Sequence, residues 1–102
     1  MNRAMLDALQ TTEWGMTHFS GIVTNRQLPL RVMRQCVTAG LCHSIGRHPM
    51  ADDEGNGPER FRETYVLTEA GFDALEAHYK GIGDHYAVKK LRELRDAKLS
   101  NA

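Results

Sequence analysis

Apolar and polar positions follow a helical period through residues 27–41, QLPLRVMRQCVTAGL. Pro29 suits the start of a helix, where its missing N–H is no loss, and Gly40 suits the left-handed residue just past the end. The pattern predicts a helix over residues 28–39. Its predicted core face holds Val32, Met33, Cys36 and Val37. Its predicted outer face is a row of polar side chains at i, i+3, i+4 and i+7, namely Arg31, Arg34, Gln35 and Thr38.

Two shorter apolar patterns precede this helix. Asn2 can cap a first helix, which ends near residues 11–12 and has an apolar side of Met5, Leu6, Ala8 and Leu9. Phe19, Ile22 and Val23 have near-helical spacing and predict a short second helix over residues 18–23. Turn-forming residues 24–27 then lead into the third helix, so helices two and three are predicted to form a helix-turn-helix.

Beyond Gly40 the side-chain pattern repeats every two residues, as it does along a β-strand. Leu41, His43 and Ile45 alternate with Cys42 and Ser44, which predicts a strand over residues 41–46. Residues 47–58 are rich in Gly, Pro, Asp and Asn and predict a loop. Residues 60–67, RFRETYVL, have high β propensity and predict a second strand, so the two strands form a β-hairpin.

Two helices are predicted after the hairpin. Thr68 can cap the first helix, and Gly81 and Gly83 end it. Its predicted buried side holds Phe72, Ala74, Leu75 and Tyr79. The second covers residues 84–99, with a narrow apolar stripe of Ala87, Val88, Leu91, Leu94 and Ala97. Such a stripe either folds back on its own domain or pairs with the same helix of a second chain. The small size of the domain favours pairing, so Val88, Leu91 and Leu94 are the predicted dimer interface.

Length and composition limit the fold to one core. The chain has 102 residues, of which 41% are hydrophobic and 25% are charged, values typical of an ordered globular domain. We therefore predict a mainly α fold with a small β-hairpin (α+β), in which residues 1–82 form the domain and residues 83–102 form a C-terminal helix and tail. No apolar run approaches the roughly 18 residues that cross a membrane, and the N-terminus does not resemble a signal peptide. Cys36 and Cys42, the only cysteines, are expected to be unpaired, so the expected location is cytoplasmic.

Charge is unevenly distributed along the chain. The formal net charge is zero, which argues against indiscriminate binding to nucleic acid. However, residues 14–51 contain no Asp or Glu, while Arg26, Arg31, Arg34 and Arg47 lie there together with three histidines. A positive face within a neutral protein is what a specific polyanion-binding surface needs.

Two local patterns resemble winged helix-turn-helix regulators of the MarR, PadR and ArsR kinds. The spacing of Met33, Cys36, Ala39, Gly40 and Leu41 is similar to the end of the recognition helix in those families. The run YVLTEAG, residues 65–71, resembles the segment that leaves the wing and opens the next helix in MarR-like and PadR-like proteins. Together the two patterns cover about residues 16–79, most of the chain, and no subfamily is assigned.

The resemblance implies a sequence-specific, double-stranded DNA-binding regulator, usually a homodimer, whose third helix enters the major groove. On such a helix an Arg side chain can donate to the two acceptors of guanine, and a Gln side chain can pair with the donor and the acceptor of adenine. The predicted DNA-binding residues are Asn25, Arg26 and Gln27 at the helix entry, Arg31, Arg34, Gln35 and Thr38 on the helix, and Arg47 and His48 on the wing. The acidic residues Asp52, Asp53 and Glu54 depart from the family pattern, because phosphate would repel them at the wing tip.

Other functions have weaker support in the sequence. The candidate metal ligands lack ligand spacing, so no metal or other cofactor is expected; they are Cys36, Cys42, His18, His43, His48, His78 and His85. No phosphate-binding loop or nucleophile elbow is present, and no enzyme is expected. The main alternative is a winged-helix module that binds protein, since one fold serves several functions. An accessory replication or recombination protein of a phage or mobile element is a further alternative.

Overall fold

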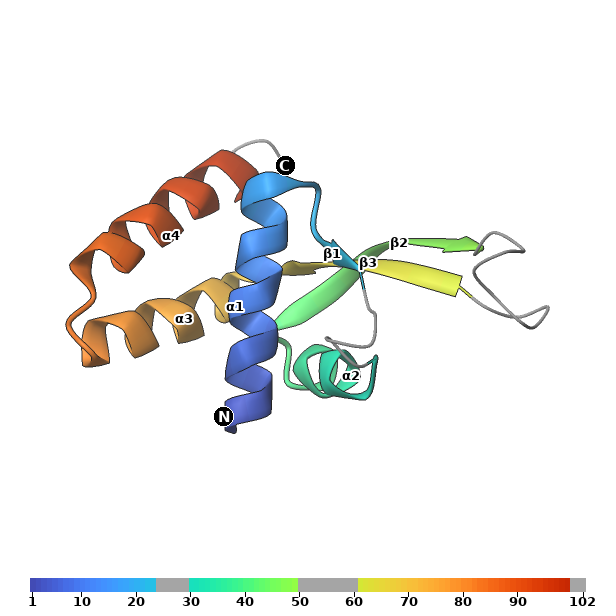
Figure 1. The fold of residues 1–102 in the computed structure, drawn as a ribbon, viewed down its shortest axis with the longest axis horizontal. Helices are drawn as coiled ribbons and strands as arrows, with labels where there is room; N and C mark the ends of the chain where they lie inside the picture. Colours follow the sequence, from blue (N-terminus) through green and yellow to red (C-terminus); the bar gives the residue numbers. More distant parts are fainter. Residues whose placement is uncertain (24–29, 50–60, 100–102) are drawn as a thin grey trace.

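Four helices and a three-stranded antiparallel sheet make up the described part of the chain (Figure 1). This computed structural model describes residues 1–23, 30–49 and 61–99. The helices are α1 (Arg3–His18), α2 (Leu30–Thr38), α3 (Glu69–Gly81) and α4 (His85–Leu99). The strands are β1 (Ile22–Val23), β2 (Cys42–Pro49) and β3 (Phe61–Leu67). The predicted α+β class, mainly helical with a small sheet, is confirmed.

The first helix is longer than the sequence predicts, and the threonines at its predicted end lie within it. Asn2 caps α1, its side-chain oxygen accepting a hydrogen bond from the Met5 N–H at 2.8 Å. The hydroxyls of Thr11 and Thr12, where the pattern predicts the end, each donate to the carbonyl four residues earlier. The helix continues to His18, and Thr12, Gly15 and Met16 are buried along it.

The predicted second helix over residues 18–23 is wrong. Ile22 and Val23 form β1, which pairs with β3 in the register Ile22↔Tyr65 and Val23↔Thr64. Gly15 permits this path, because a Cβ there would lie 2.6 Å from the Gly21 carbonyl oxygen. Within the described residues, α2 alone lies between β1 and β2, so the predicted pairing of a helix over 18–23 with the third helix is not formed. The predicted turn 24–27 and the predicted start of the third helix at residue 28 lie outside the described residues.

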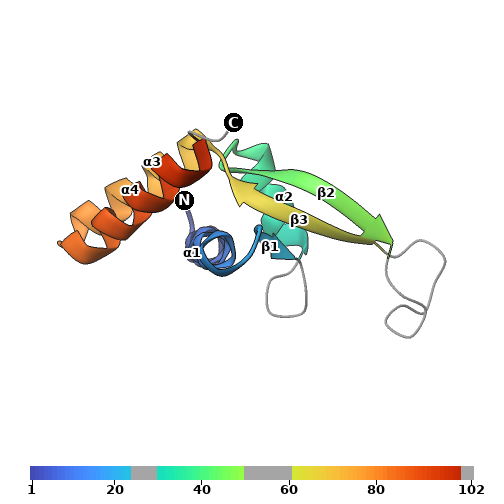
Figure 2. The ribbon, with the colours of Figure 1, turned by 90° about the horizontal axis from the view of Figure 1, so that it is seen from above.

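The strand order is β1-β3-β2, which leaves the β2–β3 hairpin with a short third strand on one edge. The hairpin pairs from Cys42↔Leu67 to Pro49↔Phe61, with a bulge at Ile45, between Ser44 and Gly46. β2 thus extends three residues into the predicted loop, of which the part beyond residue 49 lies outside the described residues. Seen from above, the hairpin extends past β1 and away from α3 and α4 (Figure 2).

The core is built around α1, which lies between the α3–α4 pair and the sheet (Figure 1). Its buried side chains come from every helix and from both long strands, and include Leu9, Met33, Leu67, Phe72, Leu75 and Leu91. The Met16 sulfur accepts a hydrogen bond from the Leu67 N–H at 3.2 Å. Tyr79 on α3 donates its hydroxyl to Glu13 Oε1 on α1 at 2.6 Å. Burial raises the pKa of the Glu13 carboxyl, and the hydrogen bond from Tyr79 opposes part of this rise.

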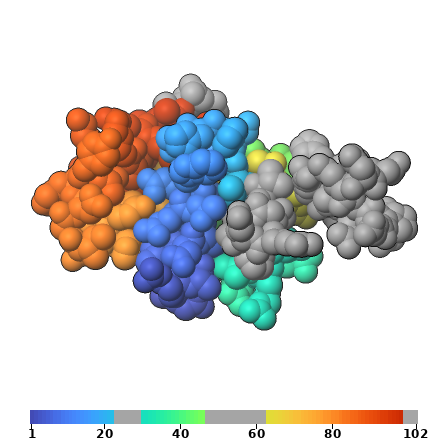
Figure 3. Space-filling model, in the orientation of Figure 1, coloured from blue at the N-terminus to red at the C-terminus, as the bar shows by residue number. Residues whose placement is uncertain are grey.

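The predicted dimer stripe on α4 is buried within its own chain. Val88 is 7% exposed and Leu91 is 1% exposed, and Leu94 packs against the same core. Ion pairs hold α4 to α3: Arg92 Nε lies 2.7 Å from Glu76 Oε1, and Arg95 contacts both Asp73 and Glu69. Of the two uses that the sequence left open for this stripe, the structure shows packing within its own chain: Val88 and Leu91 belong to the core, and a dimer interface there stays a prediction without support. In space-filling view α4, α3 and α1 form one continuous surface (Figure 3).

Candidate nucleic-acid interface

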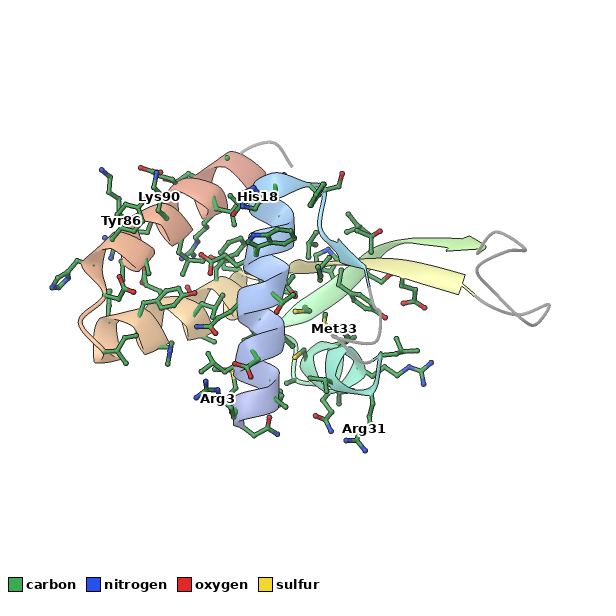
Figure 4. All side chains as sticks on the ribbon, viewed as in Figure 1. Arg3, His18, Arg31, Met33, Tyr86 and Lys90 are labelled. Atoms are coloured by element: carbon green, nitrogen blue, oxygen red, sulfur yellow. The ribbon has the colours of Figure 1, made fainter. Side chains whose placement is uncertain are left out.

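The two faces of α2 differ as the sequence predicts. Met33 and Cys36 are fully buried, whereas the predicted outer row of Arg31, Arg34, Gln35 and Thr38 is exposed. Figure 4 shows Met33 facing the body of the protein and Arg31 pointing away from it. Val37, which the period places on the core face, is 39% exposed. Since only Met33 and Cys36 are fully buried, α2 contacts the core along a narrow line and presents most of its circumference to solvent.

We call the exposed side chains of Arg31, Arg34, Gln35 and Thr38 the α2 row. Together with Ala39 they border a shallow hollow on the surface. Neither arginine of the row forms an ion pair within the described residues, so both guanidinium groups keep their donors for a ligand. Three basic side chains of α3 and α4 differ from them: Lys80 and Arg92 pair with Glu76, and Arg95 pairs with Asp73 and Glu69.

A backbone motif ends α2 and fixes the direction of the strand that follows. Gly40 has a φ of 77°, in the left-handed region, and its N–H donates to the Val37 carbonyl at 2.9 Å. The Leu41 N–H donates to the Cys36 carbonyl, also at 2.9 Å. These two bonds are those of a Schellman motif, in which glycine avoids the penalty that a Cβ brings at positive φ. The predicted end of the helix at Gly40 is confirmed.

The first turn of α3 holds this motif in place. Thr68 caps α3 by accepting a hydrogen bond from the Gly71 N–H at 3.1 Å, as the sequence predicts. Its hydroxyl also donates to the Gly40 carbonyl at 2.5 Å, and its own N–H donates to the Leu41 carbonyl at 3.1 Å. A Cβ on Gly71 would collide with the same Leu41 carbonyl oxygen. The orientation of α2 thus depends on Thr68 and Gly71, a role that the sequence analysis missed because it arises from a contact between distant segments.

The remaining predicted contacts lie partly outside the described residues. Asn25, Arg26 and Gln27 lie in the undescribed segment 24–29, and the side chains of Arg47 and His48 are likewise not described. The backbone of these last two residues belongs to β2, opposite Glu63 and Arg62 of β3. The hairpin that carries them starts directly after the α2 row. Two exposed side chains near its base, His43 and Ile45, were not among the predicted contacts.

The metal candidates are not brought together. Among the described residues, no group of three or more His, Cys, Asp or Glu side chains is placed to hold a metal ion. Cys36 and Cys42 are buried free thiols. None of the described helices is both long enough and apolar enough to cross a bilayer. No protein-family model matches the chain, and no curated protein or solved structure matches it.

Proposed function

We propose that this chain is a sequence-specific double-stranded DNA-binding protein that regulates transcription, with the α2 row in the major groove and the β2–β3 hairpin beside the phosphate backbone. The observation that carries the proposal is the α2 row itself, with a glutamine and two arginines that form no ion pair with any described residue, on the outer face of a helix anchored by Met33 and Cys36. The order helix, strand, helix, hairpin, helix and the strand order β1-β3-β2 support a winged-helix arrangement.

The dimensions of α2 suit a duplex. An α-helix with its side chains is about 10–12 Å across, which fits a major groove about 12 Å wide. The nine residues of α2 give it a length of about 13 Å at about 1.5 Å per residue. Arg31 can donate two hydrogen bonds to O6 and N7 of guanine, and Gln35 can pair with N6 and N7 of adenine. Arg34 can contact a neighbouring phosphate. The Thr38 methyl group suits contact with thymine.

The local charge also supports DNA as the ligand. The sequence holds no acidic residue between positions 14 and 51, so the α2 row and the first strand of the hairpin belong to an acid-free segment. Phosphate contacts from such a segment position a protein, while base-edge contacts provide its specificity. A neutral total charge then keeps nonspecific affinity low.

Selection of bound duplexes from a random pool tests the proposal. We expect one enriched sequence, and Arg31→Ala or Gln35→Ala should each weaken binding to it by about 1–3 kcal/mol while relaxing the preference at one base pair. Lys89→Ala on α4 is the matched control, since it removes an exposed charge far from α2 in sequence and should leave affinity and preference unchanged. A pool without enrichment, or equal affinities for Arg31→Ala and wild type, would contradict the proposal.

Repression by promoter occupancy and binding as a homodimer stay predictions. An enriched palindrome would support two copies on one site, with half-sites about one helical turn apart. Because Val88 and Leu91 are buried, a second copy must meet this chain through another surface.

One observation favours the alternative of a protein-binding module. Trp14 is 53% exposed and Phe19 is 65% exposed, with ring centroids 5.7 Å apart, and His18 lies beside the same indole at 4.9 Å. Exposed aromatic clusters often mark protein interfaces. Trp14 is the only tryptophan, so its fluorescence distinguishes the two functions. A protein partner docked on the cluster should shift the emission to the blue, whereas DNA bound at α2 should not.

A further inference from the structure

Three aromatic side chains cluster on the surface where α1 ends. Trp14 and Phe19 are each more than half exposed, and their rings lie against each other. His18 lies beside the same indole. We call Trp14, His18 and Phe19 the α1 cluster. Exposed apolar groups that gather in one place on a protein mark a surface that associates with another molecule.

The backbone fixes the position of the α1 cluster. The Phe19 N–H donates to the Gly15 carbonyl at 2.7 Å and closes the last turn of α1. Two residues later Gly21 packs against β3, so closely that a Cβ there would lie 2.5 Å from the Tyr65 carbonyl oxygen. The short segment that carries Phe19 is thus held by α1 on one side and by the sheet on the other. Aromatic side chains on fixed backbone lose little conformational freedom on binding, which suits them to anchor an interface.

The face that carries the α1 cluster has almost no charge. Among residues 10–20, Glu13 is the only acidic residue, and His18 is the only one that can become basic. Glu13 is turned toward α3, where it accepts the hydrogen bond from Tyr79. The outer faces of α2, α3 and α4, by contrast, all expose charged side chains. In a two-fold interface the same patch occurs on both partners, so an uncharged face meets its copy without repulsion between like charges.

The exposed ring of Tyr86 on α4 is not part of this face. A hollow of about 490 Å³ lies between α1 and α4, and Tyr86 lines it together with Glu13 and Thr17. The α1 cluster does not line that hollow, so it lies on another side of α1. The Lys90 ammonium lies 5.6 Å from the centre of the Tyr86 ring, which therefore already has a charged neighbour.

We propose that the α1 cluster is the interface through which two copies of this chain associate, with Trp14 and Phe19 of one copy packed against the same residues of the other. At about 150–250 Å² for a whole aromatic side chain, the exposed parts of these two residues amount to roughly 200–300 Å². An interface of standard size takes about 800 Å² from each partner, so they supply about a third of it, as central aromatic anchors do. Thr17 and Ser20, which are exposed and uncharged, provide a polar rim.

The α1 cluster lies away from the α2 row. In Figure 4 His18 is at the top of the view, close to α4, whereas Arg31 points out at the bottom. Association through α1 therefore leaves the α2 row of each copy exposed. The proposal assigns a surface to the predicted homodimer, and it rests on the proposed function only for the use of two α2 rows on one DNA site.

Sedimentation of the full-length chain without DNA tests the interface. We expect a dimer that dissociates on dilution, with the emission of Trp14 shifted to the blue as the dimer forms. Phe19→Ser should raise the dissociation constant at least about tenfold, because it removes one of the two anchors. Tyr86→Ser is the matched control: it removes an equally exposed ring outside the α1 cluster and should leave the dissociation constant unchanged. Circular dichroism shows whether each variant is folded.

Mixed copies of the wild type locate the contact without any variant. In a sample of isotope-labelled and unlabelled chains, we expect NOEs between copies that involve the Trp14 and Phe19 rings. A chain that is monomeric at every concentration would overturn the proposal and leave the α1 cluster to a partner of different sequence. NOEs between copies from another surface, or equal weakening by Phe19→Ser and Tyr86→Ser, would overturn the placement on α1. A dimer with the expected NOEs that binds no duplex would contradict the proposed function and support the interface.

Discussion

Gly71 is a position where any side chain would collide with a neighbouring part of the backbone. A methyl group there would meet the Leu41 carbonyl oxygen, which belongs to the turn between α2 and β2. We expect Gly71→Ala to destabilise the protein by about 1–3 kcal/mol, because backbone must shift to relieve the overlap. Denaturant unfolding measures the loss, and changed amide resonances at Gly40 and Leu41 would locate it.

Gly81 provides the control, since nothing lies within 4 Å of a Cβ built there. Gly81→Ala, at the other end of α3, should be neutral or stabilising by up to about 1 kcal/mol, as expected of alanine in a helix. Equal losses for the two variants would show that helix propensity, rather than contact with Leu41, decides the effect.

The Tyr79 hydroxyl and the Glu13 carboxylate form a contact whose contribution depends on pH. The pKa of Glu13 is raised above its usual 4.5 by burial, and the bond from Tyr79 lowers it, so Tyr79→Phe should raise it further. The raised pKa means that ionised Glu13 opposes folding as pH rises, while the bond to Tyr79 reduces that opposition. Tyr79→Phe should therefore cost about 1 kcal/mol near pH 7 and less near pH 3, where the carboxyl is protonated in both proteins.

Unfolding free energies at the two pH values and an NMR titration of Glu13 check this. A cost that does not change with pH would mean that Tyr79 acts through packing alone. Wild type at both pH values serves as the reference, because the other acidic groups titrate alike in the two proteins.

At the scale of elements, the apolar stripe of α4 packs against the core of its own chain, whereas the sequence also allowed it to pair with a second chain. Because Leu91 is buried in its own chain, Leu91→Ala should destabilise the protein by about 2–5 kcal/mol at every protein concentration. Tyr86→Ala, on the same helix but 70% exposed, should change stability by less than about 0.5 kcal/mol. Unfolding at two protein concentrations measures both. A Leu91→Ala protein of normal stability that has lost only self-association would restore the dimer interpretation.

The elements that the sequence predicted well have local signals at their ends. Thr68 and Gly40 cap their helices through bonds within a few residues, and the exposure of the α2 row follows from the 3.6-residue period alone. Spacing alone could not identify β1, because Phe19, Ile22 and Val23 fit a helix equally well and the choice depends on pairing with distant Tyr65. The contacts of Thr68 and Gly71 with the α2 turn could not be predicted for the same reason.

At the scale of the whole molecule, the arginines of α2 differ from those of α4 in whether they form ion pairs. The α2 row keeps its arginines free within the described residues, whereas Arg92 and Arg95 are paired with acids of α3. We expect the logarithm of the DNA affinity to fall with the logarithm of salt concentration, and Arg34→Ala to reduce that slope by about 1 if Arg34 contacts a phosphate. Lys89→Ala should leave the slope unchanged. Titrations at several salt concentrations measure it, and equal slopes for Arg34→Ala and wild type would remove Arg34 from the phosphate contacts.

The shortness of β1 has a consequence for how the chain can vary. Among the described residues, Tyr65 and Thr64 of β3 are the ones with a partner in β1, so within that part of the chain the hairpin from Glu63 outward is a ribbon of two strands. Because Cys42, Tyr65 and Leu67 of the core lie at the base of the hairpin, we expect insertions or deletions in the outer ribbon to leave their packing unchanged. Evolution or engineering can therefore change the length of the β2–β3 hairpin independently of thermodynamic stability, while α2 stays in place.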